Sequence, residues 1–279
     1  MSLMSKLLII TISLSSLLFS NDEQVVNFLK KGIGSNPSII SLDIKVVSKI
    51  PLEQPEDWEA YIVQMNGEAK AGDKTQKISQ RSIYYVGGGM ITADLYDLKT
   101  GKKLSDSMSP DFNTKYYDEA HHLFGDKNAA HKVVIFSDPL CPFCRTFVPS
   151  ALNYMKKYPK TFSVYYYHFP LRSLHPAAVP LVEAALIAES KGHKNVVEGL
   201  YKVEVDGREA NIQKIVDAFN KAQGTKIQVQ DLGTSDMKKH LEHDMKVAQE
   251  HLVKGTPTVF FDGEKDVNKL KYKNVKLIK

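Results

Sequence analysis

The sequence predicts an α/β protein (α+β overall) with two domains, a small α+β unit over residues 21–109 and a larger α/β unit over residues 128–279. Alternating apolar and polar residues in the first part are typical of half-buried strands. In the second part, buried strands alternate with helical segments, and the first strand runs directly into a Cys-x-x-Cys motif. At 279 residues the chain is long enough for two domains.

Residues 1–20 have the pattern of a secretory signal peptide. Lys6 precedes an apolar run from Leu7 to Phe19, and the chain then turns polar. A membrane-spanning helix needs about 20 apolar residues, and this run is shorter. Leu18 and Ser20 fit a cleavage site poorly, so a retained anchor is the alternative. Without a cysteine near the cut, lipoprotein anchoring is excluded.

The segment 21–109 reads as a helix followed by strands. Apolar residues at helical spacing around Val25 end at Gly32. Strands are expected over residues 40–47 and 58–65, with Asn66-Gly67 as the following turn, and a hairpin is expected over residues 82–96. The segment has no cysteine and no phosphate-loop motif, so its expected role is structural.

Residues 110–127 are predicted to form a linking helix that ends at Gly125, because aromatic and apolar residues recur there at helical spacing. His121 and His122 lie next to each other in this segment. Neighbours on a helix point about 100° apart and seldom share one ion, so no metal site is expected.

The only two cysteines, Cys141 and Cys144, follow an apolar strand over residues 133–136 and a breaking segment, Ser137-Asp138-Pro139. Cys141 is expected at the N-terminus of the next helix, where free N–H groups and the helix dipole favour its thiolate. Pro142 suits the first helical turn. A zinc site would need four ligands, and a structural disulfide across two residues would constrain the chain little. Redox chemistry is therefore the favoured interpretation, and these two are the alternatives.

Further along the chain, a second strand is expected over residues 161–168. His168 and His175 lie on its C-terminal side, where α/β sites collect, although polar residues at a loop start are the more ordinary explanation. Four amphipathic segments then form a helical insertion over about residues 176–253. The last segment, 267–279, alternates like a strand.

Three marks resemble the thioredoxin fold and, among its members, the periplasmic Dsb proteins. Pro149 follows the second cysteine by five residues, Gly255 to Phe261 resembles the cis-proline loop, and residues 167–171 read Tyr-His-Phe-Pro-Leu. The match is closest to DsbC/DsbG-type disulfide isomerases. It implies a thioredoxin-like catalytic domain with a helical insertion and a cystatin-like N-terminal dimerisation domain.

The resemblance assigns the site. Cys141 would exchange with clients and Cys144 would resolve the mixed disulfide. Pro142 and Phe143 would tune the dithiol, and Thr256 and Pro257, joined by a cis bond, would form the opposite wall of the site. No metal and no cofactor are expected beyond the redox-active Cys141–Cys144 disulfide. The buried carboxylate that many thioredoxin-like proteins carry six residues before the first cysteine is replaced by Ile135.

The expected function is therefore disulfide isomerisation of exported, cysteine-containing proteins in a Gram-negative periplasm. The chain would act as a homodimer and be reset by a DsbD-like membrane reductant. The alternatives are a DsbA-like oxidase with a DsbB-like membrane oxidant and a holdase chaperone. Removing Lys6 with the leader leaves 36 basic against 32 acidic residues, about +4, and this mild excess argues against nucleic-acid binding.

Overall fold

The computed structural model describes residues 14–278, with side chains from residue 21 onward, and divides into two compact units at Ser105/Asp106. Residues 1–13 of the predicted signal peptide lie outside the described residues. Helix α1 (Leu14–Gly34) begins within the remainder of that segment, earlier than the helix predicted around Val25. Among the described residues, no helix has both the length and the apolar character needed to cross a membrane.

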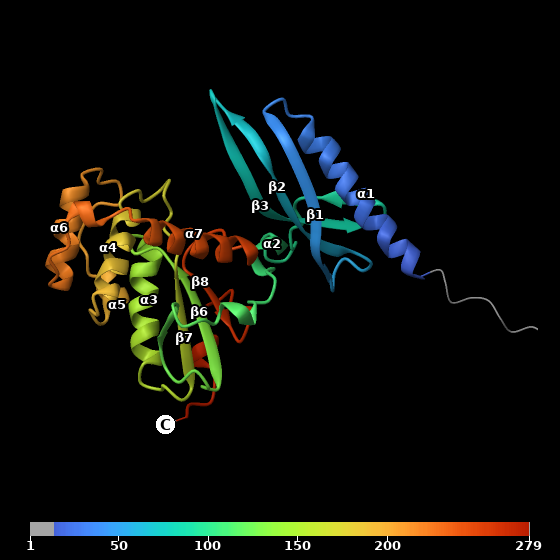
Figure 1. Ribbon diagram of the computed structural model, residues 1–279. Helices are drawn as coiled ribbons and strands as arrows, with labels where there is room; N and C mark the ends of the chain where they lie inside the picture. Colours follow the sequence, from blue (N-terminus) through green and yellow to red (C-terminus); the bar gives the residue numbers. More distant parts are fainter. Residues whose placement is uncertain (1–13, 279) are drawn as a thin grey trace, which may run out of the picture. The chain divides into compact units, whose positions relative to one another are not determined.

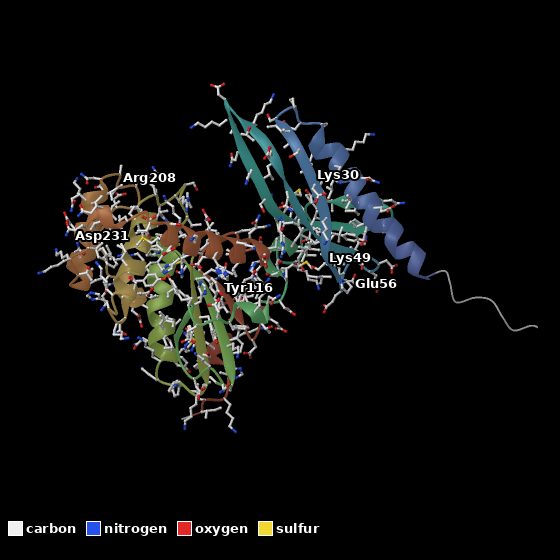
Figure 2. The ribbon with its side chains drawn as sticks, viewed as in Figure 1. Lys30, Lys49, Glu56, Tyr116, Arg208 and Asp231 are labelled. Carbon is white, nitrogen blue, oxygen red and sulfur yellow. The ribbon has the colours of Figure 1, made fainter. Side chains whose placement is uncertain are left out.

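The first unit is an antiparallel sheet with α1 packed on one face (Figure 1). Its strands are ordered as they follow in the chain: β1 (Ile39–Pro51), β2 (Glu59–Ala71), β3 (Lys74–Gly87) and β4 (Met90–Thr92). Val25 and Leu29 of α1 are buried against Ile44 and Val63 of the sheet. Lys49 of β1, labelled in Figure 2, forms an ion pair of 3.0 Å with Asp22 of α1. Helix α2 (Leu104–Ser107) follows this sheet.

The predicted turn at Asn66-Gly67 is wrong, because β2 continues through it to Ala71. The partner strand β1 shifts register between Ile39 and Ser41. A Cβ atom on Gly67 would meet the Ser41 carbonyl oxygen at 2.1 Å, so glycine serves a close backbone approach there. The predicted hairpin is confirmed at Tyr85–Gly87 and Met90–Thr92, although β4 ends before residue 96.

The predicted linking helix over 110–127 is also wrong. The segment belongs to the second unit and forms a 3-10 turn, η1 (Thr114–Tyr116), and a short strand, β5 (His122–Phe124), paired with β7. Its aromatic residues Phe112 and Tyr116 are buried on the sheet, so their spacing reflects that packing and not a helical stripe.

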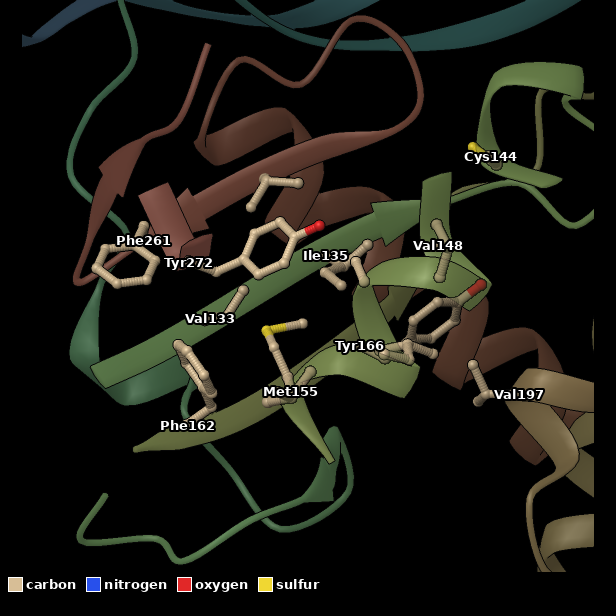
Figure 3. Close-up of a cluster of buried hydrophobic side chains, with 14 of the residues drawn as sticks. Val133, Ile135, Cys144, Val148, Met155, Phe162, Tyr166, Val197, Phe261 and Tyr272 are labelled. Atoms are coloured by element: carbon tan, nitrogen blue, oxygen red, sulfur yellow. The ribbon is translucent and has the colours of Figure 1, made fainter. Parts of the chain in front are cut away.

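The second unit is built on a mixed sheet with β6 at its centre, in the order β5-β7-β6-β8-β9. The strands are β6 (His131–Ser137), β7 (Phe162–His168), β8 (Thr258–Phe261) and β9 (Glu264–Lys265). Strand β6 runs parallel to β7 and antiparallel to β8. Helix α3 (Pro142–Met155) packs through Val148 and Met155 on the sheet face that carries Val133 and Ile135 (Figure 3).

The helical insertion is present between β7 and β8. It comprises α4 (Ala178–Ser190), α5 (Val196–Leu200), α6 (Ile212–Gln223), the 3-10 turn η2 (Val229–Asp231) and α7 (Ser235–Glu250). Helices α4 to α6 share an apolar core that includes Leu181 and Phe219, whereas Val247 and Ala248 of α7 pack on the sheet face opposite α3. The predicted terminal strand over 267–279 is wrong, since a 3-10 turn, η3 (Lys271–Lys273), buries Tyr272 there.

Candidate functional site

Cys141 lies at the N-terminus of α3, as predicted. It is the N-cap residue, with extended backbone angles (φ −67°, ψ 123°), and Pro142 occupies the first helical turn. The first helical bond runs from the Arg145 N–H to the Cys141 carbonyl oxygen at 3.0 Å. Both cysteines are free thiols, and Cys141 is 5% exposed. Cys141 therefore lies where the first N–H groups of the helix have no intrahelical partner, although its side chain accepts no capping hydrogen bond from them.

The wall opposite Cys141 is the Thr256–Pro257 loop, whose peptide bond is cis, as predicted. The Cys141 Sγ atom lies 3.5 Å from the Thr256 carbonyl oxygen and donates to it. Phe143, between the two cysteines, is 76% exposed. The structure thus brings Cys141, Pro142, Thr256 and Pro257 together and leaves an apolar ring beside them at the surface.

Cys144 lies one turn into α3, fully buried in the core cluster drawn in Figure 3. Burial raises the pKa of its thiol to about 11, against the opposing effect of a hydrogen bond with the Ser137 hydroxyl. At neutral pH Cys144 is therefore a protonated thiol, held deeper in the core than Cys141.

A chain of buried hydroxyl groups leads to Cys144. Tyr201, next to α5, donates to the Ser137 Oγ atom at 2.7 Å, and Tyr166 of β7 lies 2.7 Å from the Tyr201 hydroxyl. Each hydroxyl carries one proton. Tyr201 donates its proton to Ser137, so Tyr166 must be the donor in its hydrogen bond with Tyr201. The Ser137 hydroxyl can then donate its own proton to the Cys144 sulfur. We call Tyr166, Tyr201 and Ser137 the hydroxyl chain.

Asp138 supplies a buried carboxylate that the sequence reasoning missed. One oxygen accepts from the N–H groups of Leu140 (2.7 Å) and Cys141 (3.2 Å). The other accepts from the Leu171 N–H at 2.8 Å and the His175 Nδ1 atom at 3.0 Å. Asp138 therefore fixes the loop that carries Cys141 to the loop after β7. Its place between a strand and a proline was the available signal.

Ile135 is buried among apolar side chains of the core, where other thioredoxin-like chains carry a carboxylate (Figure 3). Of the two histidines noted after β7, His175 joins the Cys141 loop through Asp138, whereas His168 is buried with its ring centre 5.1 Å from that of Tyr166. Burial lowers the pKa of His168 to about 4, so it is neutral.

A dithiol at the start of a helix, a cis-proline loop opposite it and a central sheet flanked by helices define a thioredoxin-fold dithiol protein. The thioredoxin family model matches residues 118–278, more than half of the chain. The chain belongs to the thioredoxin family.

Comparison with curated proteins found no match. Several solved structures resemble this chain, and three of them serve as examples. Pseudomonas aeruginosa DsbA2 is 17% identical, with a TM-score of 0.39, over 52% of this chain and 84% of that one. The catalytic domain of Proteus mirabilis ScsC is 24% identical, with a TM-score of 0.42, over 56% and 88%. Oxidised BdbD from Bacillus subtilis is 17% identical, with a TM-score of 0.45, over 60% and 96%.

Proposed function

We propose that the protein is a thiol–disulfide oxidoreductase that isomerises disulfides of exported proteins. The observation that carries the proposal is the asymmetry of the two thiols. Cys141 lies at the helix N-terminus against the Thr256 carbonyl, whereas Cys144 is buried with its pKa raised to about 11. Cys141 is suited to exchange with a client disulfide, and Cys144 is suited to resolve the mixed disulfide from inside the protein.

The reaction begins when the Cys141 thiolate attacks a client disulfide. A bond forms between Cys141 and one client sulfur, and the other client sulfur leaves as a thiolate. In isomerisation, a client thiolate attacks the client sulfur held on Cys141 and releases Cys141 as a thiolate, so no net electrons are transferred. If the client does not rearrange, Cys144 attacks the Cys141 sulfur; the client is then reduced and the Cys141–Cys144 disulfide forms.

The client is expected to lie along the Thr256–Pro257 loop. An extended peptide pairs with exposed backbone groups beside such a loop, and its side chains rest on apolar surface. Phe143, between the cysteines, and Leu174, next to the His175 that Asp138 holds, are exposed by 76% and 55% and are proposed to offer that surface. Both are uncharged, which suits clients that differ in sequence but share misplaced disulfides.

The proposed setting is the Gram-negative periplasm, reached through the signal peptide over residues 1–20, with a DsbD-like membrane protein as the reductant. We also propose a DsbC/DsbG-type homodimer formed through the first unit. Strand β4 pairs with three residues of β3, and β1 and β4 are the outer strands of this sheet among the described residues. Open strand edges associate with like edges. Sedimentation of the mature protein as a monomer would sink the dimer.

The direction of the reaction is tested by trapping the thiols in cells with an alkylating reagent. Isomerase function predicts that Cys141 and Cys144 are mostly reduced and that the purified protein reactivates an enzyme with scrambled disulfides. A pair found mostly as the disulfide, with rapid oxidation of reduced clients, would show an oxidase. The Cys141→Ser variant is the control in both assays.

A further inference from the structure

A second cluster of reactive side chains lies on the sheet face opposite the dithiol. It contains His121, just before β5, and His243 and Asp244 of α7. One ligand atom from each lies within 4.8 Å of the others. Since His121 and Asp244 are 123 residues apart in the chain, the fold alone creates this group.

The ligand atoms of the cluster are held in place by partners outside it. Asp118 accepts from the His121 Nδ1 atom at 2.6 Å, which places the ring proton there and turns Nε2 toward Asp244 Oδ1 at 2.7 Å. The second Asp244 oxygen, Oδ2, accepts from the backbone N–H of His168 at 2.8 Å. A carboxylate that orients a histidine through its other nitrogen is the usual arrangement behind a metal ligand.

Further histidine nitrogens lie close to Asp244, beyond those of the cluster itself. Asp244 is fully buried, and His121 stacks on Tyr167 with 3.9 Å between ring centres. The His168 Nδ1 atom is buried and has no hydrogen-bond partner within residues 21–278. His240, one turn before Asp244, brings its Nε2 atom within 3.7 Å of an Asp244 oxygen. More nitrogen and oxygen donors therefore face this spot than its hydrogen bonds require.

We propose that His121 Nε2, a ring nitrogen of His243 and Asp244 Oδ1 bind a divalent transition-metal ion of the zinc class. Two imidazoles and one carboxylate form a known zinc ligand set, with water or another group in the fourth position. Around zinc, ligand atoms stand about 2.0–2.1 Å from the ion, so the 2.7 Å between Nε2 and Oδ1 has to widen by a fraction of an ångström. The ion replaces the proton that these two atoms otherwise share, and that proton goes to solvent.

The partly exposed His243 gives the ion an entry from the surface. The site would fasten α7 to the segment before β5, and α7 leads directly into the Thr256–Pro257 loop. The proposal does not depend on disulfide chemistry. The dithiol can also bind soft metals, so the test must remove both cysteines.

The test uses the full mature chain without a histidine tag and with Cys141→Ser and Cys144→Ser. Zinc is titrated by calorimetry, and cobalt is titrated by visible spectroscopy. One zinc ion per chain is expected, with a rise in the unfolding temperature. The cobalt complex should show tetrahedral bands and no thiolate charge-transfer band. Absence of saturable binding at micromolar zinc overturns the proposal.

Variants locate the ion. His243→Ala, at a partly exposed position, should abolish saturable zinc binding, and Asp118→Asn should weaken it by about 10- to 100-fold. His193→Ala, on an exposed loop, is the matched control and should bind like the parent. Circular dichroism checks that each variant is folded. Equal zinc affinity in His243→Ala and in the control would place the ion elsewhere and refute the site.

Discussion

Replacing Ser137 with alanine removes the last donor of the hydroxyl chain while leaving both cysteines in place. A hydrogen bond to a charged group contributes about 1.5–3 kcal/mol. One pKa unit corresponds to about 1.36 kcal/mol and to a tenfold change in thiolate population, so Ser137→Ala should raise the pKa of Cys144 further and lower its thiolate population by roughly 10- to 100-fold.

The kinetic effect is smaller than the change in thiolate population. A less acidic thiol is a better nucleophile once ionised, with a Brønsted coefficient of about 0.4–0.5. On a logarithmic scale, this gain in nucleophilicity offsets nearly half of the fall in rate that the smaller thiolate population causes. The attack of Cys144 on a Cys141 mixed disulfide should therefore slow by about 3- to 15-fold in Ser137→Ala. In the parent, this rate should rise about tenfold per pH unit over the neutral and mildly alkaline range, because Cys144 remains mostly protonated up to about pH 11.

A single-turnover assay measures this step. Cys141 attacks an aromatic disulfide reagent, keeps one aromatic thiol as a mixed disulfide and releases the other as a coloured thiolate; attack by Cys144 on the Cys141 sulfur then releases the second coloured thiolate in a separate phase. The first phase reports Cys141 and should be unchanged. Tyr154→Phe, which alters a tyrosine at the margin of the same core cluster, is the control. A second phase as fast in Ser137→Ala as in Tyr154→Phe, or one that stops rising below pH 9, would refute the reasoning.

Three further predictions follow from the same thiols. Cys141→Ser should abolish thiol–disulfide exchange, whereas Cys144→Ser should trap clients on Cys141 as mixed disulfides. Non-reducing electrophoresis detects these adducts, and adducts formed by Cys141→Ser but not by Cys144→Ser would contradict the roles assigned to the two cysteines. The reduced protein should lose up to about 3 kcal/mol of unfolding free energy as the pH rises from about 9 to 11, because the fold raises the pKa of Cys144 and the unfolded chain releases that proton first. Urea unfolding measures this loss, and Cys144→Ala should make it smaller without abolishing it, because buried tyrosines such as Tyr61 and Tyr117, whose pKa values burial raises to about 12, lose stability in the same direction. With neutral Phe143 between the cysteines, the reduction potential should fall between about −270 and −120 mV, and glutathione equilibration that gives a value outside this window would contradict the assignment.

The parts of the site that local sequence determines were predictable. Pro139 and Pro142 mark where β6 ends and α3 begins, and this places Cys141 at a helix N-terminus without reference to distant residues. The Thr256–Pro257 loop was found through the family resemblance, and its cis bond is confirmed.

Other features depend on contacts that a sequence pattern does not contain. Asn66-Gly67 is an ordinary turn signal, but the close approach of β1 keeps it within a strand. The aromatic spacing of residues 110–124 suits a helix as well as it suits packing on a sheet. Ser137 and Tyr201 are 64 residues apart, so no local signal joins them into the hydroxyl chain.

The four hydrogen bonds of Asp138 hold the fold of the loop before Cys141, whereas Cys141 itself carries the chemistry. They run to three backbone N–H groups and to His175, and none of them involves a sulfur atom. An amide at this position would set its own N–H groups against donors. In a saturation mutagenesis library sorted first for abundance and then for activity, substitutions of Asp138 should disappear in the first sort. Substitutions of Cys141 should survive that sort and disappear only in the second.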